Sequence, residues 1–408
     1  MKFCSVCSKD VPINNFSRHK RRHNGTNKKT CPVCQVPICD NVWERHLKSQ
    51  SHKDKENQLK EQQNLPTVES FLREFLDTTK GPLMHLSSAY TKEIERNGGL
   101  SDLSPGRETE ETRIWARLGL RPPILFPAAE CWQRKPPVDE YLTDLLHGFS
   151  KSTTKVYSRG KPHDPINLPP LHEVLRQLHS PDLSSTKYAI NIFAEAVELR
   201  VPNRLVGYFP VYQDSDLVTT TNITPKFSAA ELHVDHGKHG VTLLHGGCVK
   251  LWVLYPLTPH NLERFSTLHR SDTTFIELQG QLEGGELCVQ TEHQAIYLPP
   301  GCIHGTYTLQ GGLTPGIEFS TVECLEPAAK MWDLNSERAR LCGNDCYPLL
   351  EAVIMGLRSE TPARRVEAME ILCPKYKRVC KLSPGILSMV KKQLPMNCSK
   401  CGALWGKH

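Results

Sequence analysis

The chain has 408 residues, of which 38% are hydrophobic; it is too long for one small domain and can bury at least one sizeable core. No run approaches the roughly 18 uninterrupted apolar residues of a membrane span, and Met1–Lys9 is charged where a signal peptide would be apolar. We therefore expect a soluble, intracellular protein without a membrane partner.

The formal net charge of +6 is unevenly distributed along the chain. Residues 1–60 hold 13 Lys and Arg against 5 Asp and Glu, and residues 361–408 hold 10 against 2, so the segment between them is acidic. Basic ends favour a polyanionic partner such as nucleic acid, although solvated lysines without a partner explain them equally well. Many of the 16 cysteines stand in close pairs, which in a chain without a secretory signal favours metal binding over disulfides.

Two successive sets of two cysteines and two histidines open the chain. Their spacings are Cys4-x2-Cys7-x11-His19-x3-His23 and Cys31-x2-Cys34-x11-His46-x5-His52. A tight Cys pair suits a hairpin and a His pair suits one face of a short helix, so each set predicts a tetrahedral zinc, Zn(II), site in a small ββα unit. Matching apolar residues form the expected miniature cores, because units this small fold only with metal: Val11 and Phe16, then Ile38 and Trp43.

These sets resemble zinc fingers of the two-cysteine, two-histidine type, the first over residues 1–26 and the second over residues 29–56. The second, with five residues between its histidines, looks like the matrin-type subclass associated with RNA. Both have 11 rather than 12 residues between the second Cys and the first His, so base-by-base DNA reading is not expected. Nucleic-acid binding is predicted, with docking to protein as the alternative. The candidate phosphate contacts are Lys20, Arg21, Arg22, Lys28 and Lys29.

Residues 57–170 are predicted to be a linker followed by a helical region. Apolar residues at helical spacing indicate helices over Thr67–Thr79, Glu108–Leu118 and Val138–Gly148. Ser150–Pro170, rich in Lys, Ser, Gly and Pro, is predicted to be an irregular loop. Leu171–His179 and Tyr188–Val201 read as helix or as buried strand, which periodicity alone does not separate.

After Pro202 the pattern changes to short apolar runs separated by Gly, Pro and polar turns, which predicts an antiparallel barrel or sandwich. The runs are VTLLHGG, VKLWVLYPL, TFIEL, ELCVQ, QAIYLPP and GIEFSTVE. The expected fold class is therefore α+β and multidomain: two small ββα units, a helical region, a β-rich domain over residues 171–335 and a helical segment over residues 336–408.

Within the β-rich segment, His233, Asp235 and His304 are candidates for a facial metal triad. Residues i and i+2 of a strand point to the same face, so His233 and Asp235 can present a nitrogen and an oxygen to one ion, and His304 can complete the set from a facing strand. Two histidines and one carboxylate leave three positions open, as Fe(II) needs to hold a bidentate 2-keto acid and bind O2. The neighbouring histidines His236, His239 and His245 are interpreted as solvent-facing or as lying just behind the ligands.

The stretches ELHVDHG, GGCVKLWVLYP and LPPGCIHGTYTL resemble the JmjC family of cupin-fold oxygenases, over roughly residues 185–325. The resemblance implies a double-stranded β-helix that uses Fe(II), 2-oxoglutarate and O2, with the triad as metal ligands and catalytic residues. In the family, the lysine of a K-x-W-type strand pairs with the distal carboxylate of 2-oxoglutarate, and Lys250 matches it. Thr242 falls where a polar residue often helps to hold that co-substrate. Trp252 and Tyr255 are interpreted as core.

Three further cysteine pairs follow the barrel, among residues with a helical pattern from Tyr347 to Leu372. They are Cys342-x3-Cys346, Cys373-x6-Cys380 and Cys398-x2-Cys401. The last pair, in CSKCG, looks like a zinc knuckle, and either upstream pair could supply the other two ligands. A redox dithiol and unconnected buried thiols are the alternatives. The unpaired cysteines are expected to serve packing: Cys39, Cys131, Cys248, Cys288, Cys302 and Cys324.

The sequence favours a nuclear dioxygenase acting on protein, most simply a chromatin-associated histone lysine demethylase. A protein side-chain hydroxylase is the nearest alternative. A nucleic-acid-binding adaptor with a cupin that has lost its metal is the alternative of another class, and a hydrolytic zinc cupin is a third.

Overall fold

The computed structural model describes residues 1–4, 9–21, 28–34, 36–53, 67–78, 83–97, 99, 110–149, 154–158, 161–164, 168–206, 217, 219–268, 273–337 and 343–382. Contacts divide the chain into two compact units, Met1–Ser70 and Phe71–His408. The expected α+β, multidomain character with antiparallel sheets is confirmed. Among the helices of the described residues, none combines the length and the apolar character that crossing a membrane requires.

The first unit contains two short hairpins, each followed by a helix. In the first, β1 (Lys2–Cys4) pairs with β2 (Lys9–Val11) and precedes α1 (Ile13–Arg21); in the second, β3 (Lys28–Thr30) pairs with β4 (Pro37–Cys39) and precedes α2 (Asp40–Leu47). The helical aromatic residue lies beside a histidine in both: Phe16 is 6.4 Å from His19 and Trp43 is 6.3 Å from His46, between ring centroids. The two segments therefore repeat one arrangement.

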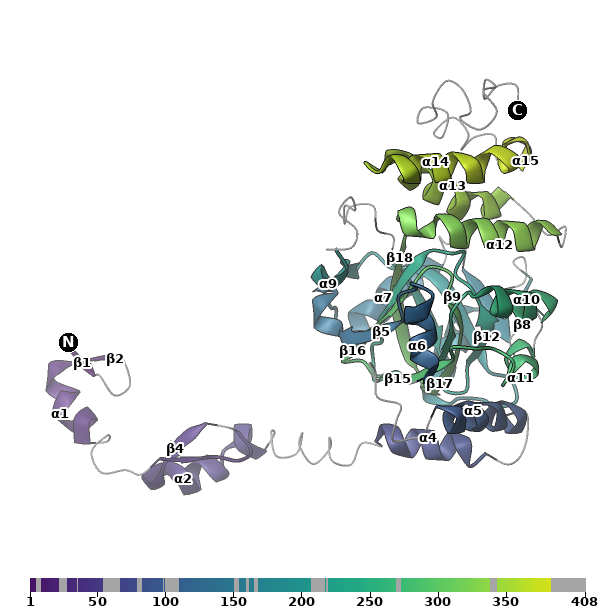
Figure 1. The fold of residues 1–408 in the computed structure, drawn as a ribbon. Helices are drawn as coiled ribbons and strands as arrows, with labels where there is room; N and C mark the ends of the chain where they lie inside the picture. Colours follow the sequence, from purple (N-terminus) through teal and green to yellow (C-terminus); the bar gives the residue numbers. More distant parts are fainter. Residues whose placement is uncertain are drawn as a thin grey trace. The chain divides into compact units, whose positions relative to one another are not determined.

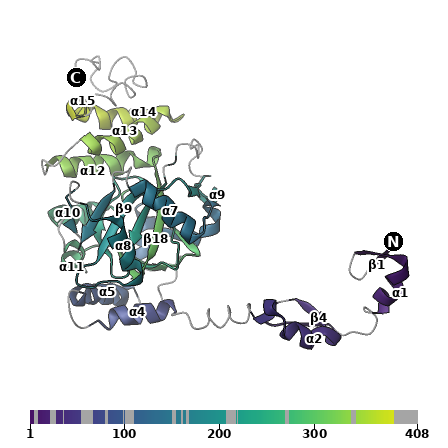
Figure 2. The ribbon, with the colours of Figure 1, turned by 180° about the vertical axis from the view of Figure 1, so that it is seen from behind.

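The second unit holds a β core of two antiparallel sheets (Figures 1 and 2). The eight strands of the large sheet, in spatial order, are β5 (Ile124–Pro127), β16 (Gln294–Leu298), β13 (His239–Thr242), β18 (Gly312–Phe319), β11 (Thr219–Thr224), β9 (Lys187–Phe193), β7 (Lys155–Ser158) and β8 (Lys161–Pro162). The small sheet is ordered β12 (Ala229–His233), β17 (Ile303–Gln310), β14 (Val249–Tyr255) and β15 (Glu286–Gln290). A separate pair joins β6 (Trp132–Arg134) to β10 (Glu198–Leu199).

Helices surround this β core. They are α4 (Val68–Leu76), α5 (Met84–Arg96), α6 (Glu110–Arg117), α7 (Val138–Phe149), α8 (Leu171–His179), α9 (Asn203–Val206), α10 (Pro259–Leu268), α11 (Thr274–Leu278), α12 (Leu325–Glu337), α13 (Gly343–Arg358), α14 (Pro362–Leu372) and α15 (Tyr376–Leu382). Helices α12 to α15 stack at one end of the core, as Figures 1 and 2 show, around a buried apolar cluster of their own. The helices expected over 67–79, 108–118, 138–148 and 347–372 are confirmed.

Two sequence predictions of local structure were wrong. The loop expected over Ser150–Pro170 contains β7, because Val156 pairs with Ala189 of β9 and the hydrogen-bonding partner lies far away in the sequence. The run TFIEL is helix α11 rather than a strand, and the amide of Phe275 near its start donates to the Glu231 carboxylate at 2.8 Å. An apolar run of five residues has no period that separates strand from helix.

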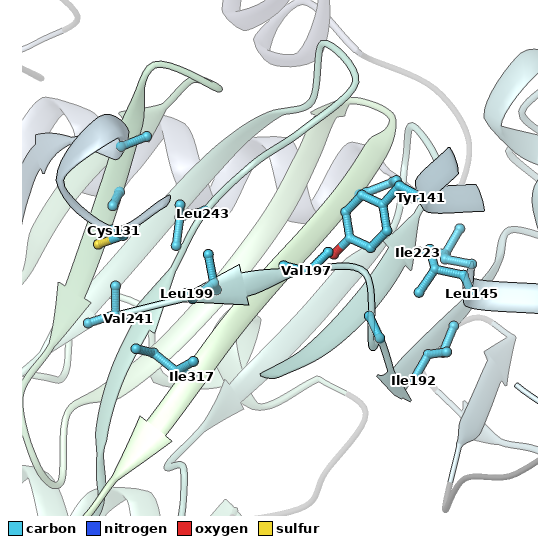
Figure 3. Close-up of a cluster of buried hydrophobic side chains, with 14 of the residues drawn as sticks. Cys131, Tyr141, Leu145, Ile192, Val197, Leu199, Ile223, Val241, Leu243 and Ile317 are labelled. Atoms are coloured by element: carbon cyan, nitrogen blue, oxygen red, sulfur yellow. The ribbon is translucent and has the colours of Figure 1, made fainter. Parts of the chain in front are cut away.

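The main apolar core lies between the large sheet and the helices on its outer face. Figure 3 shows Tyr141 and Leu145 of α7 beside Ile192 of β9 and Ile223 of β11, all fully buried. The contact between α7 and β9 is so close that a Cβ at Gly148 would lie 1.9 Å from a backbone oxygen. Side chains alternate along a strand, so those that do not enter this core lie on the opposite face of the large sheet. That opposite face is turned toward the small sheet.

A second apolar cluster joins the two sheets. It contains Trp252 and Leu254 from β14, Ile296 and Leu298 from β16, and Trp115 from α6. The sheets therefore pack face to face, with these side chains filling one part of the space between them. We call the face that each sheet turns toward this space its inner face. The residues of the candidate site lie on these inner faces or next to them.

Candidate metal centres

The three residues of the predicted triad converge at one point between the sheets. His233 of β12 lies directly opposite His304 of β17, and Asp235 follows two residues after His233. Asp235 Oδ1 is 3.5 Å from His233 Nε2, and Asp235 Oδ2 is 3.3 Å from His304 Nε2. One ligand atom from each residue lies within 4.8 Å of the others, a spacing that one metal ion can bridge.

Backbone carbonyl groups orient both imidazole rings of this triad. The Nδ1 of His233 lies 2.7 Å from the carbonyl oxygen of Glu231, and the Nδ1 of His304 lies 3.1 Å from that of Cys302. A ring nitrogen beside a carbonyl oxygen must carry the proton, so each Nε2 keeps its lone pair and faces Asp235. This arrangement behind a histidine is typical of metal ligands, because it fixes the tautomer and the ring orientation.

The charges within the triad depend on one another. Burial would raise the pKa of Asp235, but the two histidines hold it well below its usual range. Burial would lower the pKa of His304, but Asp235 outweighs it and raises that pKa, whereas desolvation and His304 lower the pKa of His233. The side chains of His233 and Asp235 are 41% and 32% exposed, against 4% for His304, so the centre is open on one side.

The turn that follows Asp235 holds the chain tightly against α12. His236 has a positive φ of 52°, and Gly237 has one of 78°. A Cβ at Gly237 would lie 2.7 Å from the backbone nitrogen of Ala328, so only glycine fits at this contact. The position of Asp235 is therefore set both by β12 and by the start of α12.

Lys250 lies on the same inner face as the triad, further along the sheet. On β14, Leu254 is opposite His304 and Lys250 is opposite Thr308, so their side chains point into the same space. Four residues of strand separate the two levels by about 13 Å. Lys250 is 4% exposed, and burial lowers its pKa. Within the part of the chain that the structure describes, no carboxylate or hydrogen-bond acceptor pairs with its ammonium group.

On β14, Trp252 lies between the level of Lys250 and the level of the triad, and Gln290 lies beside Lys250 on the neighbouring strand β15. Trp252 is buried, as expected of a core residue, and its ring centroid is 5.9 Å from that of His304. Its Nε1–H donates to Gln290 Oε1 at 3.0 Å, and Gln290 Nε2 donates to the carbonyl oxygen of Thr242 at 2.8 Å. Gln290, directly opposite Lys250 on β15, was not identified from the sequence, where it is one polar residue at the end of an apolar run.

Thr242 faces the same inner space from the large sheet. It alternates along β13 with Val241, which belongs to the outer core, and it is paired with Gly316 of β18. The three atoms nearest to a Cβ at Gly316 all belong to Val241 and Thr242, at 3.2 to 3.8 Å. No side chain projects from Gly316, so the inner face beside Thr242 is left free.

The prediction that His239 and His245 face solvent or lie just behind the ligands was wrong for both. His239 is fully buried, bonding to Tyr297 Oη at 2.9 Å and to Thr321 Oγ1 at 2.8 Å. His245 is 6% exposed and bonds to the carbonyl oxygen of Pro136 at 3.0 Å. Both point away from the triad because they lie on the outer face of the large sheet, and the sequence does not show which face a strand turns outward.

The second ligand set of the first unit also converges. Cys31, Cys34, His46 and His52 form one cluster with every ligand atom within 4.8 Å of the others. His52 Nδ1 is 3.5 Å from Cys31 Sγ and 3.4 Å from Cys34 Sγ, close to the roughly 3.5 Å between sulfur and nitrogen ligands of one tetrahedral zinc ion. The Nε2 of His46 is buried without a hydrogen-bond partner among the described residues.

Electrostatics at this cluster favour a thiolate. Burial would raise the pKa of Cys31, but the backbone N–H of Cys34, 3.4 Å from its sulfur, and further hydrogen bonds bring that pKa down to about 7. A lowered thiol pKa is what a metal-binding cysteine requires, because the thiolate is the ligand.

The remaining predicted ligands are described only in part. In the first set, Cys4 is buried and His19 is partly buried, while Cys7 and His23 lie outside the described residues. Of the C-terminal cysteines, Cys346 and Cys373 lie in or against the apolar cluster of α12 to α15. Cys342, Cys398, Cys401 and the side chain of Cys380 lie outside the described residues.

The cysteines expected to serve packing are buried wherever the structure describes their side chains, namely Cys131, Cys248, Cys288, Cys302 and Cys324. Cys288 and Cys302 belong to the apolar cluster between the sheets. The side chain of Cys39 is outside the described residues.

A scan of the chain against protein-family models finds no match. A search of curated proteins finds no match either.

Proposed function

We propose that the chain is a JmjC-type Fe(II)- and 2-oxoglutarate-dependent dioxygenase that acts on protein, with its two facing sheets forming a cupin-type double-stranded β-helix. The observation that carries this proposal is the convergence of His233, Asp235 and His304, with both Nε2 atoms directed at one carboxylate. Two histidines and one carboxylate on one side of an ion leave the opposite positions free.

The donor set suits Fe(II). Imidazole nitrogen and carboxylate oxygen are ligands that this ion accepts, and the exposed side of His233 and Asp235 leaves room for a chelating co-substrate. With Fe(II), 2-oxoglutarate and O2 bound, the centre supplies oxidation of a substrate C–H bond, coupled to decarboxylation of the co-substrate. The protein contributes orientation: the carbonyl groups of Glu231 and Cys302 hold the two rings, and α12 fixes the turn after Asp235.

Lys250 is the proposed partner of the distal carboxylate of 2-oxoglutarate. A buried ammonium group without a protein partner is costly, and a bound carboxylate offsets that cost through a charge-assisted hydrogen bond. Thr242, on the opposite sheet beside the free inner surface at Gly316, is the proposed second contact to the co-substrate. Gln290 holds Trp252 and the backbone of Thr242, and thereby shapes the space between them.

The second cluster is proposed to be a structural zinc site, with the preceding set as a similar finger. Four ligands of two kinds fill the coordination sphere of zinc and leave no position for a substrate. The run of basic residues Lys20, Arg21 and Arg22 in the sequence of the first set supports binding of nucleic acid, and protein docking is the alternative.

The oxygenase is proposed to be nuclear and to demethylate lysine on histones, with hydroxylation of a protein side chain as the nearest alternative. The fingers support a chromatin or RNA-associated location. The chemistry of the centre serves both outcomes, because hydroxylation of an N-methyl group gives a product that loses the methyl group, whereas hydroxylation of ordinary carbon is stable.

The test needs no substrate. Purified protein is mixed with Fe(II) and 2-oxoglutarate without oxygen, and the visible charge-transfer band of a bidentate keto-acid complex is recorded. We expect a band in the wild type, none in Asp235→Ala, and a band that needs more 2-oxoglutarate in Lys250→Met. A folded wild type without the band would overturn the proposal in favour of a nucleic-acid-binding adaptor. Tight zinc at the triad without any 2-oxoglutarate binding would favour the hydrolytic cupin.

A further inference from the structure

Glu318 occupies an unusual position for an acidic residue. It lies on β18, an interior strand paired with β13 on one side and β11 on the other. Its neighbours Ile317 and Phe319 belong to the outer core, so Glu318 points toward the inner space between the sheets. It is nevertheless exposed, unlike the other residues of its strand. An exposed side chain on the inner face of an interior strand indicates that the space in front of it is open to solvent.

This carboxylate faces the same inner space as the triad without belonging to it. Glu318 is not part of the cluster of candidate metal ligands. The protein atoms around this side chain shield it from water, and together with the negative charges of Asp235 and Glu351 they raise the pKa of Glu318 to about 7, whereas Lys238 and His304 oppose this rise. Repulsion by Asp235 accords with two carboxylates that face the same space between the sheets.

No described residue neutralises Glu318 directly. It forms no ion pair or hydrogen bond with the part of the chain that the structure describes. Lys238, whose positive charge acts on Glu318, is itself paired with the Glu351 carboxylate at 2.6 Å. A carboxylate that borders a cleft without a partner in its own chain is suited to a partner that arrives with the ligand.

Charge balance indicates the sign of that partner. In the proposed oxygenase, the charges of Fe(II) and Lys250 are balanced by Asp235 and the two carboxylates of 2-oxoglutarate. Glu318 then adds one negative charge to this space that the count leaves unbalanced. A cationic side chain entering the cleft would be attracted, whereas an anionic one would be repelled.

We propose that Glu318 is a specificity residue that selects substrates whose reacting side chain carries an ammonium group, such as lysine or methylated lysine. This inference rests on the proposed metal centre and deepens it by assigning the residue that selects an ammonium-bearing side chain over a neutral or anionic one. Glu318 pairs with the ammonium group and holds the adjoining carbon atoms toward the metal, and it takes no part in ligating the metal.

The probe is n-butylammonium, which reproduces the end of a lysine side chain, with n-butanol and butyrate as neutral and anionic counterparts. The full-length protein is loaded with Mn(II) and 2-oxoglutarate, and paramagnetic relaxation of the probe's protons is measured by NMR. Mn(II) reports weak binding near the metal without turnover. We expect relaxation of n-butylammonium to exceed that of n-butanol about tenfold in the wild type, as one charge-assisted pair implies.

Matched variants separate recognition from folding and from metal binding. Glu318→Gln keeps the shape of the side chain and is expected to remove the preference for n-butylammonium, while Glu318→Lys is expected to transfer it to butyrate. Glu263→Gln, at an exposed position of α10, should behave as the wild type. Equal relaxation of the three probes, or an unchanged preference in Glu318→Gln, would overturn the inference alone. Failure of the wild type to bind Mn(II) and 2-oxoglutarate would overturn the proposed function, and the inference with it.

Discussion

The two ligand clusters of this chain are built in opposite ways. At Cys31, Cys34, His46 and His52, four donors come from a hairpin and from short helical turns that have little other packing. At His233, Asp235 and His304, two donors come from paired strands and the third from the residues just after one of them, and hydrogen bonds to carbonyl groups already orient the two rings. The four-residue cluster can fill all the coordination positions of a zinc ion, whereas the triad leaves coordination positions open.

This difference indicates which interactions hold the ligands of each centre in place. A hairpin and one short helix bury too little apolar surface to fold alone, so the zinc ion proposed for this cluster would contribute to folding. The sheets of the second unit bury a large core, so the triad is arranged whether or not a metal binds. A site in which the protein fills every coordination position is therefore suited to stabilising the fold. A site with open coordination positions on a rigid support is suited to catalysis.

The largest effect is expected at the closed site. In Cys31→Ser the segment should lose the proposed zinc ion and unfold, because binding of structural zinc contributes on the order of 10 kcal/mol to folding. Zinc content should fall by about one ion per chain, and proteolysis should begin within residues 28–53. Cys39→Ser, a change at a cysteine outside the ligand set of the same segment, is the control. A variant that keeps both its zinc and its resistance to proteolysis would remove the contrast between the two centres.

The open site should lose its metal without losing its fold. In Asp235→Ala, affinity for Fe(II) or Mn(II) should fall at least about 100-fold, while thermal unfolding of the metal-free second unit changes little. Metal titration and melting curves measure the two effects. His236→Asn is the control, because asparagine tolerates the positive φ at this position and His236 is outside the ligand set. Collapse of the fold in Asp235→Ala would show that the triad serves structure.

Lys250→Met should separate ligand binding from stability. Affinity for 2-oxoglutarate should fall about 100-fold, because a buried charge pair loses one partner. The metal-free protein should become more stable at neutral pH, since the variant no longer buries an unpaired charge.

The same variant predicts a pH dependence. Burial lowers the pKa of Lys250, so its charge destabilises the folded state below that pKa, and the penalty fades as pH rises toward the ordinary value of 10.5. The stability gain of Lys250→Met should therefore shrink over this range in thermal unfolding at increasing pH. A variant less stable than the wild type at neutral pH would indicate that Lys250 has a structural partner.

The smallest effect is expected at Thr242. Thr242→Val keeps the shape of the side chain and removes one hydrogen-bonding group, so affinity for 2-oxoglutarate should fall about fivefold. Titration of the charge-transfer band measures the change, and the band should reach its full height at saturation. An effect as large as that of Lys250→Met would mean that Thr242, rather than Lys250, dominates co-substrate binding.

The sequence predicted the ligands better than it predicted the local structure around them. Spacing identified the set at Cys31, Cys34, His46 and His52, because a Cys-x2-Cys pair and a His pair on a helix are local geometries. In the triad, spacing identified His233 and Asp235 only, and His304 came from the expected facing strand and from the family resemblance. Gln290, Glu231 and Glu318 were not identified, since each acts through partners that are distant along the chain. The segment containing β7 was misjudged for the same reason, as its partner is the distant β9.

The sequence by itself determined which residue types carry chemistry and which segments alternate as strands or repeat as helices. Tertiary structure decided which face of each strand turns inward, because strand pairing depends on distant residues and a shift of one residue exchanges the faces. It thus placed Lys250 and Glu318 in the space of the triad and turned His239 and His245 away from it. Local spacing assembles ligands from neighbouring residues, whereas the environment that gives a buried charge its role is made by contacts across the fold.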